Sequence, residues 1–95
     1  MSQTDFIVHE AKDTVGVIVV EGIQQGQTLS GWVMATDESL SVTVAADIPI
    51  GHKIAVCDMA AGDTAVKYGQ DIGKIIAAVA RGDHVHTHNL KTKRW

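Results

Sequence analysis

The sequence has few of the residues on which small folds often depend. Only one of its 95 residues is cysteine and one is proline, and aromatic residues make up 4%. A single cysteine, Cys57, excludes an intrachain disulfide, and its place in the apolar run 54–59 is typical of a small core residue. Apolar residues nevertheless make up 45% of the chain. We therefore expect a folded domain whose core consists of Val, Ile, Ala, Leu and Met.

The sequence also lacks the charge and the hydrophobic segments that mark several functional classes. Its formal net charge is −3, which argues against a nucleic-acid-binding surface. A basic tail over residues 91–95 is the local exception, and it is either an interface anchor or a frayed terminus. No apolar run approaches the roughly 20 residues that span a bilayer, and no signal-peptide pattern opens the chain. We expect a single domain over residues 1–95, located in the cytoplasm.

β-Branched residues gather in short runs, which predicts a mainly all-β fold. The runs lie at 14–20, 39–44, 54–56 and 84–88, and Gly or Asp bounds them. Within 39–44, apolar and polar residues alternate strictly, as in a half-buried antiparallel strand. We expect this strand to pair with 32–35 across a turn at 36–38.

A short apolar-x-x-Gly pattern occurs four times, at 23–26, 48–51, 59–62 and 79–82. Glycine adopts positive φ without a steric penalty, so each copy predicts a tight corner that directs the next strand. Several such corners favour a small, bent domain over a flat sheet. Segment 71–79 has helical apolar spacing but contains Gly73. We expect it to be a strand running into a turn, with a single helical turn as the alternative.

Three histidines alternate near the end of the chain, at His84, His86 and His88. On a strand, a period of two places all three side chains on one face. Such a face can bind a divalent metal or present neutral acid–base groups near pH 7. From spacing alone, a solvated polar strand face is the favoured alternative. Because no cysteine or carboxylate completes a closed site, an open site or one completed by another chain is expected.

Two further pairs of polar residues lie beside predicted corners. His52 and Lys53 follow Gly51, and Lys67 and Tyr68 precede Gly69. Side chains near corners can converge on a ligand, and a lysine can bind a carboxylate, sulfonate or phosphate. Surface lysines that serve only solubility are the alternative. The sequence contains no phosphate-binding loop and no nucleophile elbow.

Three motifs, in this order, resemble the N-terminal domain of the altronate and galactarate dehydratase family. They are Asp-Ile-Pro-Ile-Gly-His-Lys-Ile-Ala over 47–55, Val-Lys-Tyr-Gly-Gln-Asp-Ile-Gly over 66–73 and Gly-Asp-His-Val-His-Thr-His-Asn over 82–89. The resemblance covers about residues 5–90. It implies an SAF domain with a β-clip type fold and at most short helical turns.

The resemblance also implies a function. In this family the domain usually precedes a much larger catalytic domain, so the chain resembles the small subunit of a two-subunit lyase. Such a lyase would eliminate sulfite or water from a small anionic hydroxy acid. The implied cofactor is a divalent metal, with iron as the first candidate. It would be bound by this chain or wholly by a large catalytic (beta) subunit. The chain alone would be inactive, and it could also form a homo-oligomer.

Family motifs assign expected roles to individual residues. His86 and His88 would be catalytic, and His84, His86 and His88 would be the metal candidates. The substrate-binding candidates are His52, Lys53, Lys67, Tyr68 and Asn89, with Asn89 also fixing the end of the His-containing strand. A non-catalytic binding or assembly module and a stand-alone metal carrier are the competing hypotheses.

Overall fold

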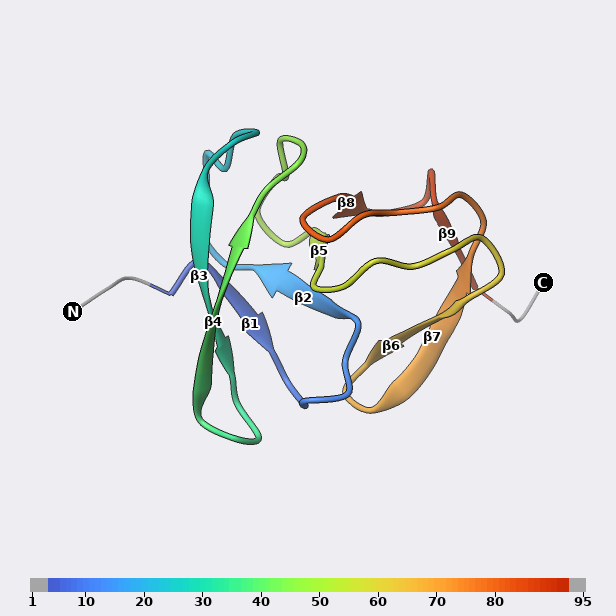
Figure 1. The fold of residues 1–95 in the computed structure, drawn as a ribbon, viewed down its shortest axis with the longest axis horizontal. Coiled ribbons are helices and arrows are strands. Elements are labelled where there is room, and N and C mark those ends of the chain that lie inside the picture. Colours follow the sequence, from blue (N-terminus) through green and yellow to red (C-terminus); the bar gives the residue numbers. More distant parts are fainter. Residues whose placement is uncertain (1–3, 93–95) are drawn as a thin grey trace.

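The computed structural model describes residues 4–92, and within this range the chain forms nine β-strands and no helix (Figure 1). Six of these strands form one sheet, in the order β4 (Glu38–Thr43), β3 (Thr28–Val33), β1 (Phe6–Val8), β2 (Val15–Ile18), β5 (Lys53–Ala55) and β8 (His84–Val85). The other three form a second sheet, in the order β6 (Thr64–Lys67), β7 (Gln70–Ile75) and β9 (Leu90–Lys91). The predicted all-β fold is confirmed. None of the described segments forms a helix long and apolar enough to cross a membrane.

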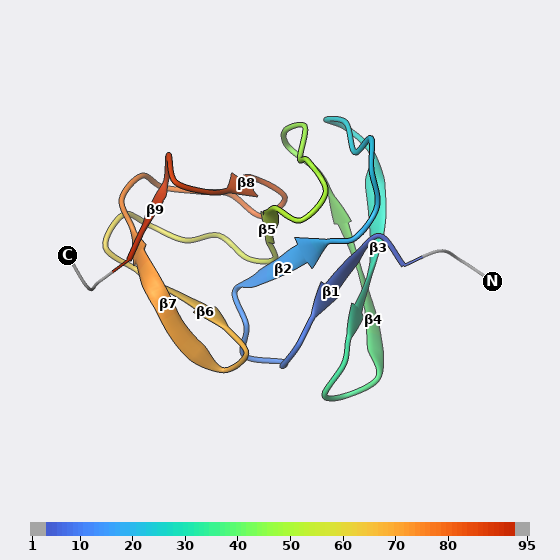
Figure 2. The same ribbon diagram turned by 180° about the vertical axis from the view of Figure 1, so that it is seen from behind.

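Strand β5 lies between two parts of the molecule. Figures 1 and 2 show the β3–β4 hairpin on one side and the β6–β7 hairpin on the other, with β2 and β5 between them. Each part has its own apolar cluster, one around Phe6 and one around Ile75. Because successive strand residues face opposite ways, Ile54 packs in the first cluster and Ala55 in the second. His52 and Lys53 therefore enter β5 where the two clusters meet.

The β3–β4 hairpin confirms the strand pairing predicted from alternation, but its turn lies at 34–37 and not at the predicted 36–38. Trp32 lies opposite Ser39, and the pairing extends further back along β3 than predicted, to Thr28. Val42 is buried as the alternation requires. The turn contains Asp37 at a φ of 56°, and its carboxylate accepts a 2.9 Å hydrogen bond from the Trp32 indole.

A parallel pairing of β1 with β3 was not predicted, and it places Phe6 at the centre of the first cluster. Phe6 lies opposite Gly31 and is fully buried. A Cβ atom on Gly31 would collide with the Phe6 ring, so glycine is required where the ring crosses the strand. The one phenylalanine of the chain thus packs against backbone that has no side chain.

The four predicted corners are confirmed. Each glycine has a positive φ, at 93°, 84°, 98° and 93° for Gly26, Gly51, Gly62 and Gly82. The corners also associate in two pairs, which was not predicted. Isolated antiparallel bridges join Ile23 to Ile48 and Met59 to Val79, and all four of these side chains are buried. The same local arrangement, a bridge between two corners, thus joins distant segments of the chain at two places.

Segment 71–79 is a strand and a bend, so the helical alternative is wrong. Strand β7 occupies Gln70–Ile75, and the chain then bends into the corner at 79–82. A Cβ on Gly73, whose φ is 153°, would meet the Lys91 carbonyl oxygen and the Leu90 side chain. Close contact with β9 therefore overrides the apolar spacing. Of the basic tail, Lys91 lies in β9, whereas Lys93, Arg94 and Trp95 lie outside the described residues.

Candidate functional site

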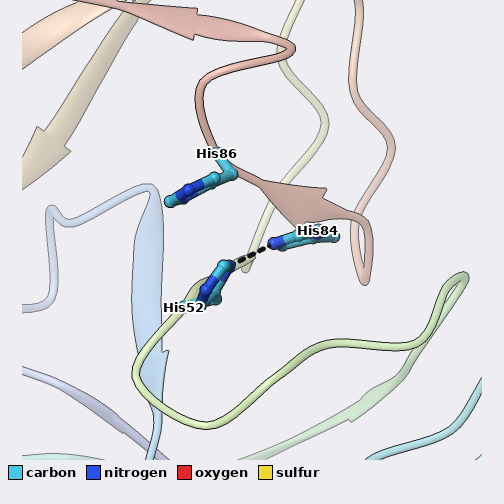
Figure 3. A group of neighbouring side chains, drawn as sticks. All are labelled: His52, His84 and His86. Atoms are coloured by element: carbon cyan, nitrogen blue, oxygen red, sulfur yellow. Dashed lines mark hydrogen bonds between the residues drawn. The ribbon is translucent and has the colours of Figure 1, made fainter.

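Three histidines from two distant parts of the sequence meet beside β8 (Figure 3). His52 lies just before β5, His84 begins β8, and His86 follows the end of β8. One ring nitrogen from each lies within 4.8 Å of the others. His52 Nδ1 is 2.8 Å from His84 Nε2, and the His52 and His86 rings stack with their centroids 4.2 Å apart. We call these three residues the histidine cluster.

Strand pairing explains how the cluster forms. β5 and β8 are antiparallel neighbours, with Ile54 opposite His84. Two of the glycine corners, at Gly51 and Gly82, lead directly into these strands. Each corner is followed within two residues by a histidine, so pairing of the strands brings His52 and His84 together.

The predicted strand over 84–88 is wrong beyond Val85, because the Asn89 side chain ends it. Asn89 Nδ2 donates to the His84 carbonyl at 2.9 Å, and its Oδ1 accepts from the His86 N–H at 2.9 Å. The backbone groups of a continuing strand would bond to a neighbouring strand; here a turn over 87–89 satisfies them internally. Asn89 is only 5% exposed. Its geometry is that of a residue that positions the histidines, and its substrate contact stays a prediction.

The electrostatic surroundings of His84 and His86 favour the neutral forms of these two imidazoles. Burial, followed by the positive charges of His52, His88, His86 and Lys53, lowers the pKa of His84. Desolvation and then His52, Lys53 and His88 lower the pKa of His86. The pKa of Lys53 is lowered as well, by burial and then by Lys67. Neutral imidazoles near pH 7 can accept a proton or bind a metal, and the surrounding cations favour an anionic ligand.

An open pocket of about 430 Å³ adjoins the cluster. It lies between the first pair of corners and β8, so His84 belongs both to the pocket wall and to the histidine cluster. The remaining lining residues are Gly22, Ile23, Gln24, Asp47, Ile48 and Pro49. A small acid seated there would lie beside the His84 imidazole.

The structure does not bring every predicted residue into this group. His88 is exposed, and its ring centroid is 5.2 Å from that of His84, but it is not one of the three residues whose nitrogens converge. Lys67 is linked to the site only through its charge on Lys53. Tyr68 lies in the β6–β7 turn, which Figures 1 and 2 both show at the opposite edge from β8.

The Lys-Tyr-Gly motif has a clear structural role in that turn. Tyr68 and Gly69 have φ values of 56° and 70°, as a type I′ hairpin turn requires. The buried Asp13 carboxylate accepts hydrogen bonds from both of their N–H groups, at 2.9 and 2.8 Å. Tyr68 is 52% exposed, and the centroid of its ring lies 3.8 Å from that of the His9 ring. His9 was not among the residues singled out from the sequence. Substrate binding by Lys67 and Tyr68 stays a prediction.

Comparison with known proteins identifies the class of domain. The family model for the altronate/galactarate dehydratase SAF domain matches residues 4–93, and the chain belongs to this family. Among its relatives is (2R)-sulfolactate sulfo-lyase subunit alpha of Chromohalobacter salexigens, 54% identical over 96% of this chain and 97% of the relative. The protein of the same name from Paracoccus pantotrophus is 55% identical over 66% of this chain and 96% of the relative. Altronate dehydratase of Escherichia coli is 44% identical over 58% of this chain but only 11% of that enzyme.

Proposed function

We propose that this chain is the small subunit of a two-subunit (2R)-sulfolactate sulfo-lyase. The observation that carries the proposal is the match along nearly the whole length of a sulfo-lyase alpha subunit, at 54% identity. The reaction removes the proton on C2 of sulfolactate and expels sulfite from C3. The enol that remains takes up a proton on C3 and releases the proton of its C2 hydroxyl as it becomes pyruvate. Sulfolactate therefore gives pyruvate, sulfite and one proton, and both atoms and charge balance.

The histidine cluster suits one wall of a site for this reaction. Removal of a proton next to a carboxylate requires a base within hydrogen-bonding reach, and a neutral imidazole is such a base at pH 7. His86 and His88 are the candidates for that role. Sulfolactate carries a sulfonate and a carboxylate, and Lys53, whose charge acts on both His84 and His86, is the cation best placed to bind one of them.

The enolate that develops also needs an electrophile, and the family resemblance implies a divalent metal for it. The donor set present here fits such an ion, because imidazole nitrogens are good ligands for zinc, iron and nickel. When bound, the ion would supply polarisation of the substrate carboxylate. We take iron as the first candidate, with the large subunit as an alternative location for its ligands.

The partner in this proposal is a large beta subunit, which the word alpha in the relatives' names supports. The three residues of the cluster are only half-buried, so a second chain would be needed to exclude water from it. We therefore expect the chain alone to be inactive and the pair to work in the cytoplasm. The similarity to altronate dehydratase favours a sugar-acid dehydratase subunit as the second candidate function.

Activity of the reconstituted pair distinguishes these functions. The chain would be purified with its large subunit and given sulfolactate, altronate or galactarate, with sulfite and 2-oxo acid as readouts. We expect sulfite from sulfolactate only when both subunits are present. Oxo acid from altronate or galactarate without sulfite release would support the dehydratase instead. Full activity of the large subunit alone would reduce this chain to an assembly module.

A further inference from the structure

We infer that His52, His84 and His86 together form a three-histidine metal site on this chain, with coordination positions left open for substrate. The inference rests on the proposed function, because it assigns the electrophile of that reaction to the small subunit. It differs from the set that sequence spacing suggests, since His52 takes the place of His88. The ligands therefore come from two glycine corners rather than from one strand.

The distances carry this ligand set. Metal–imidazole bonds are about 2.1 Å long, so two ligands at a tetrahedral angle have nitrogens about 3.4 Å apart. One ring nitrogen of each histidine lies within 4.8 Å of the other two, and His52 Nδ1 is 2.8 Å from His84 Nε2. A tetrahedral metal would thus widen the separation between His52 Nδ1 and His84 Nε2 by small ring rotations. The hydrogen bond that now joins His52 and His84 would give way to two metal bonds.

The backbone holds these rings in place. The His52 N–H donates to the Pro49 carbonyl at 3.1 Å, and its own carbonyl accepts from the Ile18 N–H at 3.0 Å. His84 is fixed by pairing with β5, and Asn89 ties the His84 carbonyl to the His86 N–H. Ligands on such braced segments lose little conformational freedom when a metal binds.

The surroundings leave room for substrate at the metal. Three protein ligands leave at least one position open, which is the arrangement of catalytic rather than structural metal sites. All three residues are half-buried, and the pocket of about 430 Å³ begins at His84. With His86 as a ligand, His88 becomes the candidate base, because its ring lies next to His84 but its nitrogens are outside the group.

Metal binding tests the site without reference to turnover. Co²⁺ would be titrated into the full chain and into its complex with the large subunit, and both the visible absorption and competition with a chelator would be followed. We expect one ion per small subunit. Loss of one ligand in His52→Ala should weaken Co²⁺ binding by roughly 100-fold. Loss of a residue that only hydrogen-bonds to a metal ligand already weakens metal binding by about 10–100-fold. His84→Gln, checked for folding by circular dichroism, should do the same.

His88→Ala and His9→Ala are the matched controls, and both should bind Co²⁺ as the unmodified chain does. Loss of binding in His88→Ala equal to that in His52→Ala would overturn this ligand set, and so would unchanged binding in His52→Ala. Failure of both the chain and the complex to bind Co²⁺ would overturn the site. Sulfite release that survives His52→Ala at full rate would refute the site and leave the proposed function standing. Normal Co²⁺ binding without sulfite release would refute the proposed function alone.

Discussion

Replacing Asn89 by alanine should destabilise the whole domain. Both of its hydrogen bonds are 2.9 Å long and join it to the backbone on either side of Val85. Because the side chain is only 5% exposed, its loss leaves the His84 carbonyl and the His86 N–H poorly hydrated. Each unsatisfied buried group costs about 1–3 kcal/mol, so for these two groups we expect a loss of roughly 2–6 kcal/mol in the free energy of unfolding. That is a large fraction of the about 5–15 kcal/mol of a typical domain.

Urea unfolding followed by circular dichroism measures this loss. Gln27→Ala is the matched control, since Gln27 also accepts a backbone hydrogen bond with a side-chain amide oxygen but is exposed. Its loss should cost less than about 0.5 kcal/mol, as for most surface substitutions. An Asn89→Ala variant as stable as Gln27→Ala would refute the claim that Asn89 holds the histidine turn. Asn89→Asp, which keeps the acceptor for His86, should be intermediate.

Three further predictions follow from particular residues. Gly82→Ala should lower stability more than Gly26→Ala in thermal unfolding, because both have a φ of 93° but only at Gly82 would a Cβ meet another atom within 4 Å, the Thr43 carbonyl oxygen. In the metal-free chain, lowered pKa values of His84 and His86 mean that the unfolded state binds more protons below its pKa of 6.5. The free energy of unfolding should therefore fall as pH drops below about 6.5. A urea midpoint that rises as the pH is lowered from 7.5 to 5.5 would contradict this. Cys57 is exposed, so the prediction that it is a small core residue is wrong. Partial desolvation and then Asp58 and Asp63 raise the pKa of its thiol, so iodoacetamide should alkylate it more slowly at pH 8 than a small free thiol, and equal rates would refute the shift.

Local chemistry made part of the fold predictable. The corner glycines can be predicted from sequence because the preference for positive φ belongs to a single residue. The alternation in 39–44 likewise predicts a half-buried strand from a short window. The pairing of Phe6 with Gly31 could not be found in this way. It depends on a contact between residues far apart in sequence, and no short window contains both partners.

The candidate site shows the same division. The period of two in 84–88 correctly placed His84 and His86 together, but His88 lies outside the histidine cluster. It assumed an extended strand, and the turn that Asn89 stabilises ends that strand after Val85. His52 was found as a motif residue and not as a neighbour of His84, since only the β5–β8 pairing brings the two together. Repetition of a glycine corner just before each of them was the available signal.

The rate of sulfite release by the reconstituted pair tests most directly whether this chain supplies a wall of a lyase site. We would compare the unmodified small subunit with a His52→Ala/His84→Gln variant, after size-exclusion chromatography shows that both assemble with the large subunit. We expect the variant to release sulfite from sulfolactate at least about 100-fold more slowly, as loss of a directly acting polar group does in other enzymes. Sulfite release at the unmodified rate by an intact variant complex would contradict this.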